Sequence, residues 1–430
     1  MFFERPDRGE TAVLVHIVLE AEQEQEDPAE FEELVLSAGA VPVSYIKGTR
    51  KRPDAGHFVG SGKLDEIAAA VKEHGAELVL FNHSLTPSQE RNLEKRLQCR
   101  VLDRTGLILD IFAQRARSYE GKLQVELAQL EHTVTRLKRG WTHLDRQKGG
   151  IGLKGAGETQ LELDQRMIRQ RIKNINKSLV KVRSQREQGR RSRKRADIPT
   201  ISLVGYTNAG KSSLFNAMAG AQAYAADQLF ATLDSTLRRI ELPNYGGAIL
   251  ADTVGFISHL PHKLVEAFRA TLEETVQASL LLHVIDAANE QHEYFTEQVN
   301  EVLTEIGADQ VPCLRVYNKI DLLHDREPML ERDQDGSPIK IWLSARTGAG
   351  VDVLLAAISE LLGEDVVQRR VTLLPEHGRL RARLYARGAV RSETVDAAGT
   401  VSLEIRLPRN DLDRLLVDEG ITPASFGLSL

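Results

Sequence analysis

The stretch ISLVGYTNAGKSSLF, residues 201–215, constrains the fold more than any other part of this 430-residue chain. An apolar run typical of a buried strand leads into the spacing GxxxxGKS, and a helix-forming run follows. This order places a glycine-rich loop at a helix N-terminus, where backbone N–H groups can surround phosphate oxygens. Residues 201–215 therefore predict a phosphate-binding loop (P-loop) in a doubly wound α/β domain.

Three further motifs follow in order, each at the end of an apolar strand: ILADTVGF at 249–256, CLRVYNKIDLL at 313–323 and IWLSARTG at 341–348. Asp321 of NKID can accept hydrogen bonds from guanine N1–H and from the 2-amino group. Adenine lacks that amino donor, so a buried carboxylate at this position rejects adenine. The ordered set of motifs predicts a GTPase domain that binds GTP and GDP.

Each motif supplies side chains with defined tasks. Lys211 is expected to pair with the β- and γ-phosphates, and the Ser212 hydroxyl to bind Mg²⁺. Asp252 would hold Mg²⁺ through a water molecule, and the Gly255 amide would contact the γ-phosphate. Asn318 would brace the base-binding loop.

The remaining residues of NKID and of the segment SAR are expected to contact the guanine base. Lys319 would cover the guanine ring. A backbone amide in the segment Ser344, Ala345 and Arg346 would meet guanine O6. These contacts complete the expected recognition of the base.

LFATLDSTLRR at 229–239 lies between the first two motifs and contains the candidate switch threonine. Thr232 is the first choice for completing the Mg²⁺ shell when γ-phosphate is present, with Thr236 and Ser235 as competitors. Together with Lys211 and Gly255, Thr232 forms the expected catalytic set.

Two further positions bear on hydrolysis. Phe256 stands where many GTPases place a water-orienting glutamine, so intrinsic hydrolysis is expected to be slow. Asn208 either helps to hold a K⁺ ion beside the β- and γ-phosphates, in place of an arginine finger, or only stabilises the loop.

The residues expected to contact nucleotide or its metal come from all of these motifs. They are Gly205, Tyr206, Thr207, Asn208, Ala209, Gly210, Lys211, Ser212, Ser213, Phe230, Ala231, Thr232, Leu233, Asp234, Asp252, Thr253, Val254, Gly255, Asn318, Lys319, Ile320, Asp321, Ser344, Ala345 and Arg346.

Charge is distributed unevenly along the chain. Between Ala116 and Asp197 there are 21 Lys and Arg against nine Asp and Glu, a surplus of 12 positive charges. Because the whole chain has a net charge of −5, the remainder carries −17. A localised basic segment in an acidic protein is either a solvated helix face or a polyanion-binding surface, and this concentration favours polyanion binding.

The basic segment reads as an antiparallel helical hairpin. Two apolar stripes repeat at spacings of four and three, and the stretch GGIGLKGAGETQ separates them. Each stripe is narrow, so the two helices must cover each other. Because a two-helix hairpin has little core, we expect it to pack against the N-terminal domain. GRRSRKRAD at 189–197 reads as a basic linker. The stripes consist of Leu123, Leu127, Leu130, Val134, Leu137 and Trp141, and of Ile168, Ile172, Ile175, Leu179 and Val182.

The remaining pattern completes a multidomain α/β architecture. Alternating strand and helix signals predict an N-terminal α/β domain at 1–115, in which FVGSGK is a turn and helix start rather than a P-loop. The hairpin follows at 116–196 with its tip at 149–158, then the GTPase domain at 197–365. Residues 366–430 form a small α+β domain, with strands VTLLP and VSLEIRL and helix RNDLDRLLVD.

The composition fits a cytoplasmic protein. Cys99 and Cys313 have no companions at metal-ligand spacing, which indicates neither a disulfide framework nor a zinc site. The apolar runs at 12–19 and 279–285 fall short of the roughly 20 residues that span a membrane. The N-terminal residues carry charges and no apolar stretch, so no secretory signal is expected.

GGIGLKGAGETQLELDQR, followed by GYTNAGKS, FATLD, DTVGF, NKID and SAR, resembles the HflX family of ribosome-associated GTPases. The resemblance covers the whole chain, and the segment 149–166 is its most specific part. Ala156 departs from the family, which often has proline there, and this change is expected to loosen the loop slightly.

The resemblance implies a monomeric, partly ribosome-associated GTPase that binds the 50S subunit and splits 70S ribosomes under stress. It also implies that the hairpin tip approaches 23S rRNA near the peptidyl-transferase centre. Glycines would let the backbone approach RNA closely, and basic side chains would meet phosphates. The alternatives are a GTP-regulated RNA-binding or assembly factor without splitting activity, and an RNA-modifying enzyme, for which no motif is found. The RNA-contacting set is Arg146, Lys148, Gly149, Gly150, Gly152, Lys154, Gly155 and Gly157.

Overall fold

The computed structural model forms two compact units. One comprises Met1–Ile240, Ala248–Glu331 and Ile339–Val351, and the other comprises Glu241–Gly247, Arg332–Pro338 and Asp352–Leu430. The structure describes the chain apart from residues 1–8, 21–27, 141–159, 196–197, 221–229, 231, 233–235, 244, 258–268, 325, 364–365, 374–376, 387–388, 396–400, 409–411, 413–414 and 417–430.

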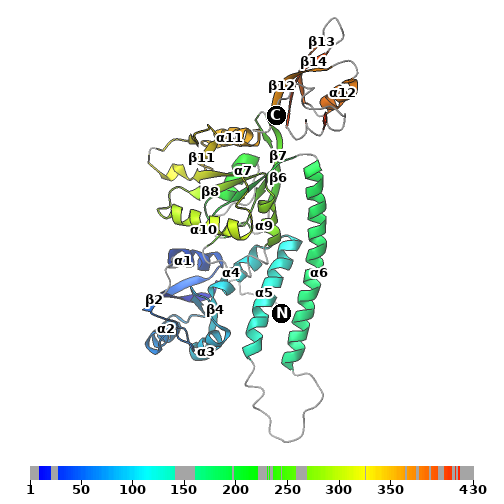
Figure 1. The fold of residues 1–430 in the computed structure, drawn as a ribbon. Coiled ribbons are helices and arrows are strands. Elements are labelled where there is room, and N and C mark those ends of the chain that lie inside the picture. The colour runs from blue at the N-terminus through cyan, green and yellow to red at the C-terminus, as the bar shows by residue number, and fades with distance from the viewer. Residues whose placement is uncertain are drawn as a thin grey trace. The chain divides into compact units, whose positions relative to one another are not determined.

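The N-terminal sheet has four parallel strands in the order β2-β1-β3-β4. They are β1 (Thr11–Leu19), β2 (Val41–Arg50), β3 (Leu78–Phe81) and β4 (Arg100–Asp103). The residues of β3 are all buried, as expected for a strand covered on both faces. This arrangement confirms the expected N-terminal α/β fold (Figure 1).

Helices cover both faces of this sheet. One core joins α1 (Pro28–Ser37) and α4 (Arg104–Arg115) to the sheet, and a second joins α2 (Ser61–His74) and α3 (Pro87–Leu97) to its other face. Gly60 is the N-cap of α2, so FVGSGK is a turn and helix start as predicted. At the start of α3, the Thr86 side chain accepts from Gln89 N and so pairs one of the N–H groups that a helix start leaves free.

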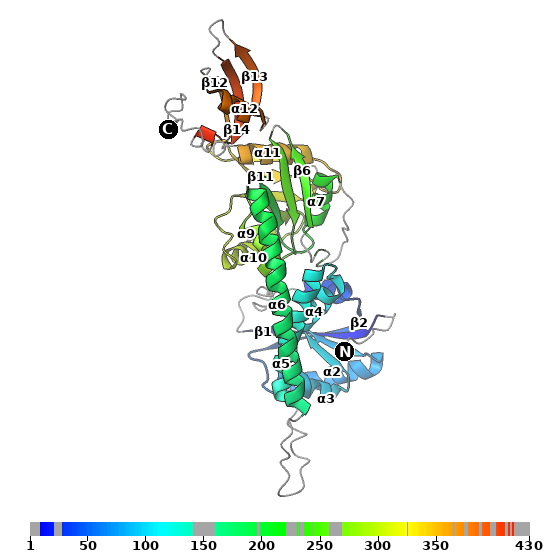
Figure 2. The same cartoon turned by 90° about the vertical axis from the view of Figure 1, so that its right-hand side faces the viewer.

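The hairpin consists of α5 (Tyr119–Gly140) and α6 (Gln160–Arg195), which run side by side in both views (Figures 1 and 2). Leu123, Leu127 and Ile175 form a buried seam between them, with Leu130, Ile172 and Leu179 packed against it. Val125 and Ala128 of α5 join the core around α1 and α4. The expected lean on the N-terminal domain is therefore confirmed, while the tip 149–158 and its RNA-contacting set lie outside the described residues.

The predicted linker at 189–197 is wrong for its larger part, because α6 continues without interruption to Arg195 (Figure 2). Arginine and lysine are good helix formers, and those that follow Gly189 continue the helix despite the cost of that glycine. The stop signal comes later, at Pro199. The second arm has 36 residues against 22 in the first, longer than the apolar stripe alone indicates.

The GTPase domain contains a seven-stranded sheet in the order β10-β11-β9-β8-β5-β7-β6. The five strands from β11 to β7 pair in parallel, and β10 and β6 are the edges. The strands are β5 (Thr200–Val204), β6 (Thr236–Leu242), β7 (Gly246–Asp252), β8 (Leu280–Asp286), β9 (Cys313–Asn318), β10 (Met329–Arg332) and β11 (Pro338–Trp342).

The helices of this domain lie between successive strands in the chain. A core of Val204, Leu272, Leu281 and Val299 joins α9 and α10 to β5 and β8. All four motif strands end at the same edge of the sheet, because parallel strands share a direction. The helices are α7 (Lys211–Ala219), α9 (Arg269–Val276), α10 (His292–Glu305), the 3₁₀ turn η2 (Ile320–Leu322) and α11 (Val351–Gly363).

The C-terminal segment forms an antiparallel sheet, β12-β14-β13, and a helix. Its elements are β12 (Val366–Leu373), α12 (Gly378–Ala386), β13 (Val390–Val395) and β14 (Val401–Pro408). Leu412, Leu415 and Leu416 are helical and buried in its core, in agreement with the expected last helix. The α+β class was predicted, whereas α12 and β13 were not.

Among the described residues, no helix combines the length and the apolar character needed to cross a membrane.

Candidate nucleotide-binding site

The P-loop connects β5 to α7 and is tied to the DTVGF segment by backbone hydrogen bonds. Thr207 N donates to Phe256 O (2.7 Å), and Phe256 N donates to Gly205 O (3.1 Å). The Phe256 side chain is buried in the core with Val204 and Leu272. It therefore extends the sheet and packs the core, and it cannot orient a water molecule.

Two P-loop glycines are required by close approach and by backbone conformation. Gly205 has φ +146°, and a Cβ there would lie 2.2 Å from the Val284 carbonyl oxygen. Gly210 has φ +91°, and its Cβ would lie 2.2 Å from Asn318 Nδ2. L-residues rarely adopt these dihedrals, so the loop's shape depends on glycine at both places.

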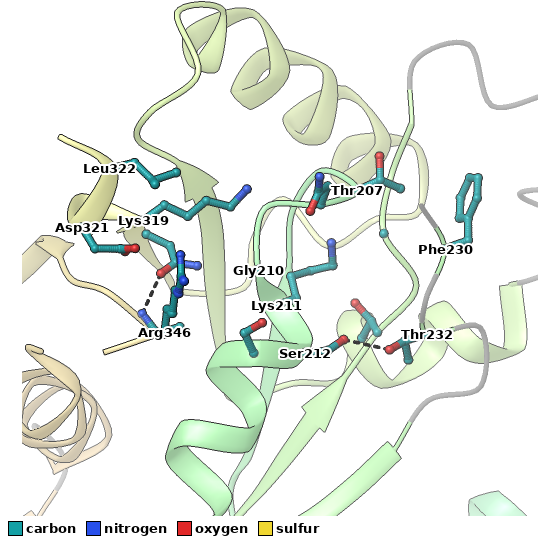
Figure 3. A pocket seen from close by; sticks show the side chains of 16 residues that line it. Thr207, Gly210, Lys211, Ser212, Phe230, Thr232, Lys319, Asp321, Leu322 and Arg346 are labelled. Carbon is teal, nitrogen blue, oxygen red and sulfur yellow. Dashed lines mark hydrogen bonds between the residues drawn. The ribbon is translucent and has the colours of Figure 1, made fainter. Parts of the chain in front are cut away.

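A cavity of about 550 Å³ opens between the P-loop and the loops that follow β7, β9 and β11 (Figure 3). Ser212 and Thr232 lie on one side of it, and Lys319, Asp321 and Arg346 lie on the other. The lining residues are Thr207, Asn208, Gly210, Lys211, Ser212, Ser213, Phe230, Thr232, Thr253, Gly255, Asn318, Lys319, Asp321, Leu322, Ala345 and Arg346. The structure thus brings four motifs, far apart in sequence, to one site.

Three oxygen-bearing side chains meet at one end of the cavity. Ser212 Oγ lies 2.8 Å from Thr232 Oγ1, and both hydroxyls donate to Asp252 Oδ2, at 2.8 and 2.9 Å. Asp252 Oδ1 is buried and has no hydrogen-bond partner among the described residues. Hydroxyl and carboxylate oxygens are the ligand types of Mg²⁺, so this cluster fits that ion, directly or through water.

Three residues, Thr232, Thr236 and Ser235, compete for the role of switch threonine. Thr232 lies in the cluster with Ser212 and Asp252, whereas Thr236 is the first residue of β6. Ser235 lies outside the described residues. The geometry therefore favours Thr232 over Thr236.

Burial sets the charge balance at this end of the cavity. Burial, with a smaller contribution from the Lys319 charge, lowers the pKa of Lys211 to about 8, against the opposing effect of the Asp252 charge. Burial also raises the pKa of Asp252, against hydrogen bonds from Ser212 and Thr232 and the Lys211 charge. A bound polyphosphate would favour the charged ammonium, and a bound cation would favour the carboxylate.

The base side of the cavity is organised by Asn318, which is 2% exposed. Its Nδ2 donates to Ala209 O, and its Oδ1 accepts from Ala345 N, both at 2.9 Å. Lys319 Nζ is held by Asp286 Oδ2 at 2.7 Å. The expected bracing role of Asn318 is visible as a direct link between the P-loop and the SAR segment.

Asp321 departs from the sequence expectation of a buried carboxylate. Its side chain is exposed, and Oδ1 accepts a hydrogen bond from Ser344 Oγ at 2.6 Å. Asp321 and the neighbouring Leu322 line the cavity and are both exposed. The expected burial is therefore absent from the protein's own fold, while Ser344 still orients the carboxylate.

Several expected nucleotide contacts do not line the cavity. Tyr206 turns its hydroxyl to Glu30, and Val254 and Ile320 are buried in cores. Ser344 does not line the cavity but donates a hydrogen bond to Asp321. Leu322 lines the cavity, although it was not among the expected contacts. An apolar residue directly after the motif aspartate was the available signal. The cavity is also not lined by Gly205, Ala209 or Asp252. The described residues do not include Ala231, Leu233 or Asp234.

We predict that Gly210→Ala weakens guanine-nucleotide binding. The new methyl group would overlap Asn318 Nδ2, and an L-residue in a left-handed conformation costs roughly 1–2 kcal/mol, or about tenfold, before that overlap is counted. Titration with a fluorescent GDP measures the affinity.

Gly220→Ala is the matched control. Gly220 ends α7 with φ +57°, and its Cβ would meet nothing within 4 Å. The same backbone strain away from the cavity should leave nucleotide affinity unchanged. Equal losses in both variants would contradict the role given to the contact between Gly210 and Asn318.

Comparison with known families matches nearly the whole chain. Residues 25–113 match "GTP-binding GTPase N-terminal", and residues 115–193 match "GTP-binding GTPase Middle Region". Residues 200–319 match "50S ribosome-binding GTPase", and residues 329–423 match "HflX C-terminal domain".

Individual relatives agree. GTPase HflX of Escherichia coli (strain K12) is 59% identical over 417 residues, covering 97% of this chain and 98% of that protein. GTPase HflX of Caldanaerobacter subterraneus subsp. tengcongensis is 46% identical over 393 residues, covering 91% and 89%. A solved complex of SsGBP with GDP is 28% identical, with a TM-score of 0.47, covering 82% of this chain and 98% of that one. The chain belongs to the HflX family of GTPases and is a GTP-hydrolysing P-loop enzyme.

Proposed function

We propose that this GTPase binds the 50S ribosomal subunit and splits 70S ribosomes under stress, with GTP hydrolysed to GDP and phosphate. The observation that carries the proposal is the union, in one chain, of a guanine-nucleotide cavity with a basic helical hairpin. The matching domain family is described as 50S ribosome-binding, and we transfer that partner to this chain. The protein acts as a monomer in the cytoplasm, partly bound to ribosomes.

The described part of the hairpin supports an RNA partner. Arg169, Lys173, Lys177 and Lys181 recur at intervals of four along α6 and are all exposed. Residues four apart lie on one side of a helix, so these cations form a stripe. The apolar seam around Ile175 is used against α5, which leaves the stripe for phosphates.

We assign nucleotide chemistry to the cavity as follows. Lys211 holds the β- and γ-phosphates, and the Gly255 amide contacts the γ-phosphate. A Cβ at Gly255 would lie 3.0 Å from Lys211 Nζ and 2.9 Å from Thr207 Cγ2, so only glycine leaves room there. Ser212, Thr232 and Asp252 would hold Mg²⁺, which supplies positive charge against the phosphate oxygens when bound.

Hydrolysis by the isolated chain should be slow, because Phe256 is buried in the core and no glutamine stands in its place. Asn208 lines the cavity with φ +59°, and it serves either a K⁺ ion or the loop's own conformation. Binding to the large subunit would then complete the site.

We predict that 50S subunits accelerate GTP turnover by orders of magnitude over the isolated protein. We also predict that the protein with GTP lowers light scattering from 70S particles, because two separate subunits scatter less than one ribosome. Stimulated hydrolysis without a fall in scattering would instead favour an assembly factor.

Replacing K⁺ with Na⁺ in the hydrolysis assay tests the role of Asn208. Equal rates of hydrolysis in both salts would exclude a K⁺ ion held by Asn208.

We predict that Asp321→Asn weakens GTP binding by roughly tenfold to a hundredfold and favours xanthosine triphosphate. The amide reverses the donor and acceptor pattern that guanine N1–H and its amino group require, and an unpaired polar group costs about 1–3 kcal/mol. Competition titrations with GTP and xanthosine triphosphate measure the preference. Unchanged GTP affinity would refute base recognition by Asp321.

We predict that replacing 149–157 with a short neutral linker impairs ribosome splitting and leaves GTP affinity nearly unchanged. The arm α5 has 22 residues, and at 1.5 Å per residue this is about 33 Å, which makes the tip a poor second phosphate loop. Parallel titrations of GTP and 50S subunits measure both properties. Lost GTP binding with intact splitting would mean that these glycines hold nucleotide.

A further inference from the structure

The N-terminal domain and the nucleotide-binding loops share one apolar core. Phe230, Val254 and Ile257 are 2%, 7% and 3% exposed and belong to the same buried cluster as the α1 and α4 side chains. Phe230 directly precedes the threonine region of the cavity, and Val254 and Ile257 flank Gly255 and Phe256. Two segments beside the γ-phosphate position are therefore packed on the N-terminal domain.

Phe230 makes the most specific of these contacts. Its ring meets the Phe112 ring of α4 edge to face, with 4.6 Å between centroids and 77° between planes. Such aromatic pairs add stability beyond the area they bury. Phe230 also has φ +54°, a conformation that bulky residues keep only when their surroundings hold it. Phe112 supplies part of that surrounding.

The position of Phe230 matters because Thr232 is two residues away. Thr232 already lies within hydrogen-bond distance of Ser212 and Asp252. The short backbone between the two residues limits the distance between them. Packing of Phe230 in the N-terminal core therefore restricts the positions open to the Thr232 hydroxyl (Figure 3).

A buried polar chain fixes the P-loop to the same domain. Tyr206 Oη donates to Glu30 Oε2 at 2.6 Å. Glu30 forms an ion pair with Arg104, and Arg104 donates to Asn82 Oδ1 at 2.8 Å. Glu30 and Arg104 are 8% and 4% exposed, so these two members of the hydrogen-bonded series are shielded from water. The P-loop and the Phe230 segment thus have anchors on α1 and α4 of one domain.

We propose that the N-terminal domain positions the switch segment for GTP, with Phe112 and Phe230 as positioning residues that hold Thr232 at the metal-binding oxygens. This inference rests on the role of Thr232 given under Proposed function. Holding Phe230 in this core favours the triphosphate state, because the switch threonine is expected to bind Mg²⁺ only when γ-phosphate is present. GDP binding does not draw on that contact.

The test compares Phe112→Leu with Phe81→Leu in the full-length chain. Both residues are fully buried phenylalanines of the N-terminal domain, but Phe81 packs in the core around α2 and α3, away from Phe230. Affinities are measured for a non-hydrolysable GTP analogue and for GDP in the presence of Mg²⁺. Phe112→Leu should lower analogue affinity roughly tenfold, within the range typical of coupled sites, and leave GDP affinity unchanged. Phe81→Leu should change neither.

A double-mutant cycle with Phe230→Leu tests the contact from its other side. If the two rings act together, Phe112→Leu combined with Phe230→Leu should be no worse than either single change. Retained GDP affinity in the Phe112→Leu variant shows that its nucleotide domain is folded. Additive losses, or a GTP-to-GDP preference that falls equally in Phe112→Leu and Phe81→Leu, would overturn the proposal.

Thr232→Ala separates this inference from the assignment beneath it. Loss of Mg²⁺-dependent analogue affinity in Thr232→Ala, with Phe112→Leu behaving like Phe81→Leu, removes only the positioning role. Unchanged analogue affinity in Thr232→Ala removes the threonine assignment and the positioning role together. Losses in both Thr232→Ala and Phe112→Leu, with GDP affinity kept, are the expected result.

Discussion

The buried amide of Asn318 is the interaction on which the nucleotide cavity depends. It is the last residue of β9, and it bonds both to Ala209 of the P-loop and to Ala345 of the SAR segment. One side chain thereby connects three loops that are separate in sequence. The link exists only because Gly210 leaves space for the Asn318 side chain. Gly210 and the Asn318 amide together thus determine how the P-loop lies against the base-binding loops.

Preorganisation of this kind has an electrostatic counterpart at the other end of the cavity. Lys211 and Asp252 are both buried, and burial moves the pKa of each toward its neutral form. Ser212 and Thr232 donate to one oxygen of Asp252, and the other oxygen is buried without a partner among the described residues. Such a site gains most from a ligand that brings both phosphate and a cation, because each opposes one of the burial costs.

Sequence spacing predicted the parts of the molecule whose geometry is local. GxxxxGKS, DxxG and NKID each lie on one strand–loop unit, so their residues could be placed at the sheet edge without a structure. Exposure of Asp321 could not be read in this way, because it depends on whether a base covers the carboxylate. The contact of Phe230 with Phe112 could not be predicted either, because it joins two residues that are distant in sequence.

Errors in the element assignments have equally specific causes. High charge and Gly189 suggested a linker at 189–197, yet α6 continues to Arg195 because the arginine and lysine residues after Gly189 are good helix formers. In strand β6 the apolar residue Leu237 is exposed and is followed by two exposed arginines, so its apolar alternation is weak. The strand β10 has only four residues at a sheet edge. Short or one-sided elements carry little periodicity for a sequence pattern to reveal.

The packing of α4 gives the hairpin a physical connection to the cavity. Asp103 caps α4, with Oδ1 accepting from Gly106 N at 2.8 Å, and its Oδ2 accepts from Arg136 of α5 at 2.8 Å. Nine residues further along α4, about 14 Å away, Phe112 meets Phe230. Any movement of α5 that breaks the bond between Arg136 and Asp103 removes a partner from the carboxylate that starts this helix. The same helix, α4, therefore contacts the hairpin through Asp103 at its start and the switch segment through Phe112 near its end.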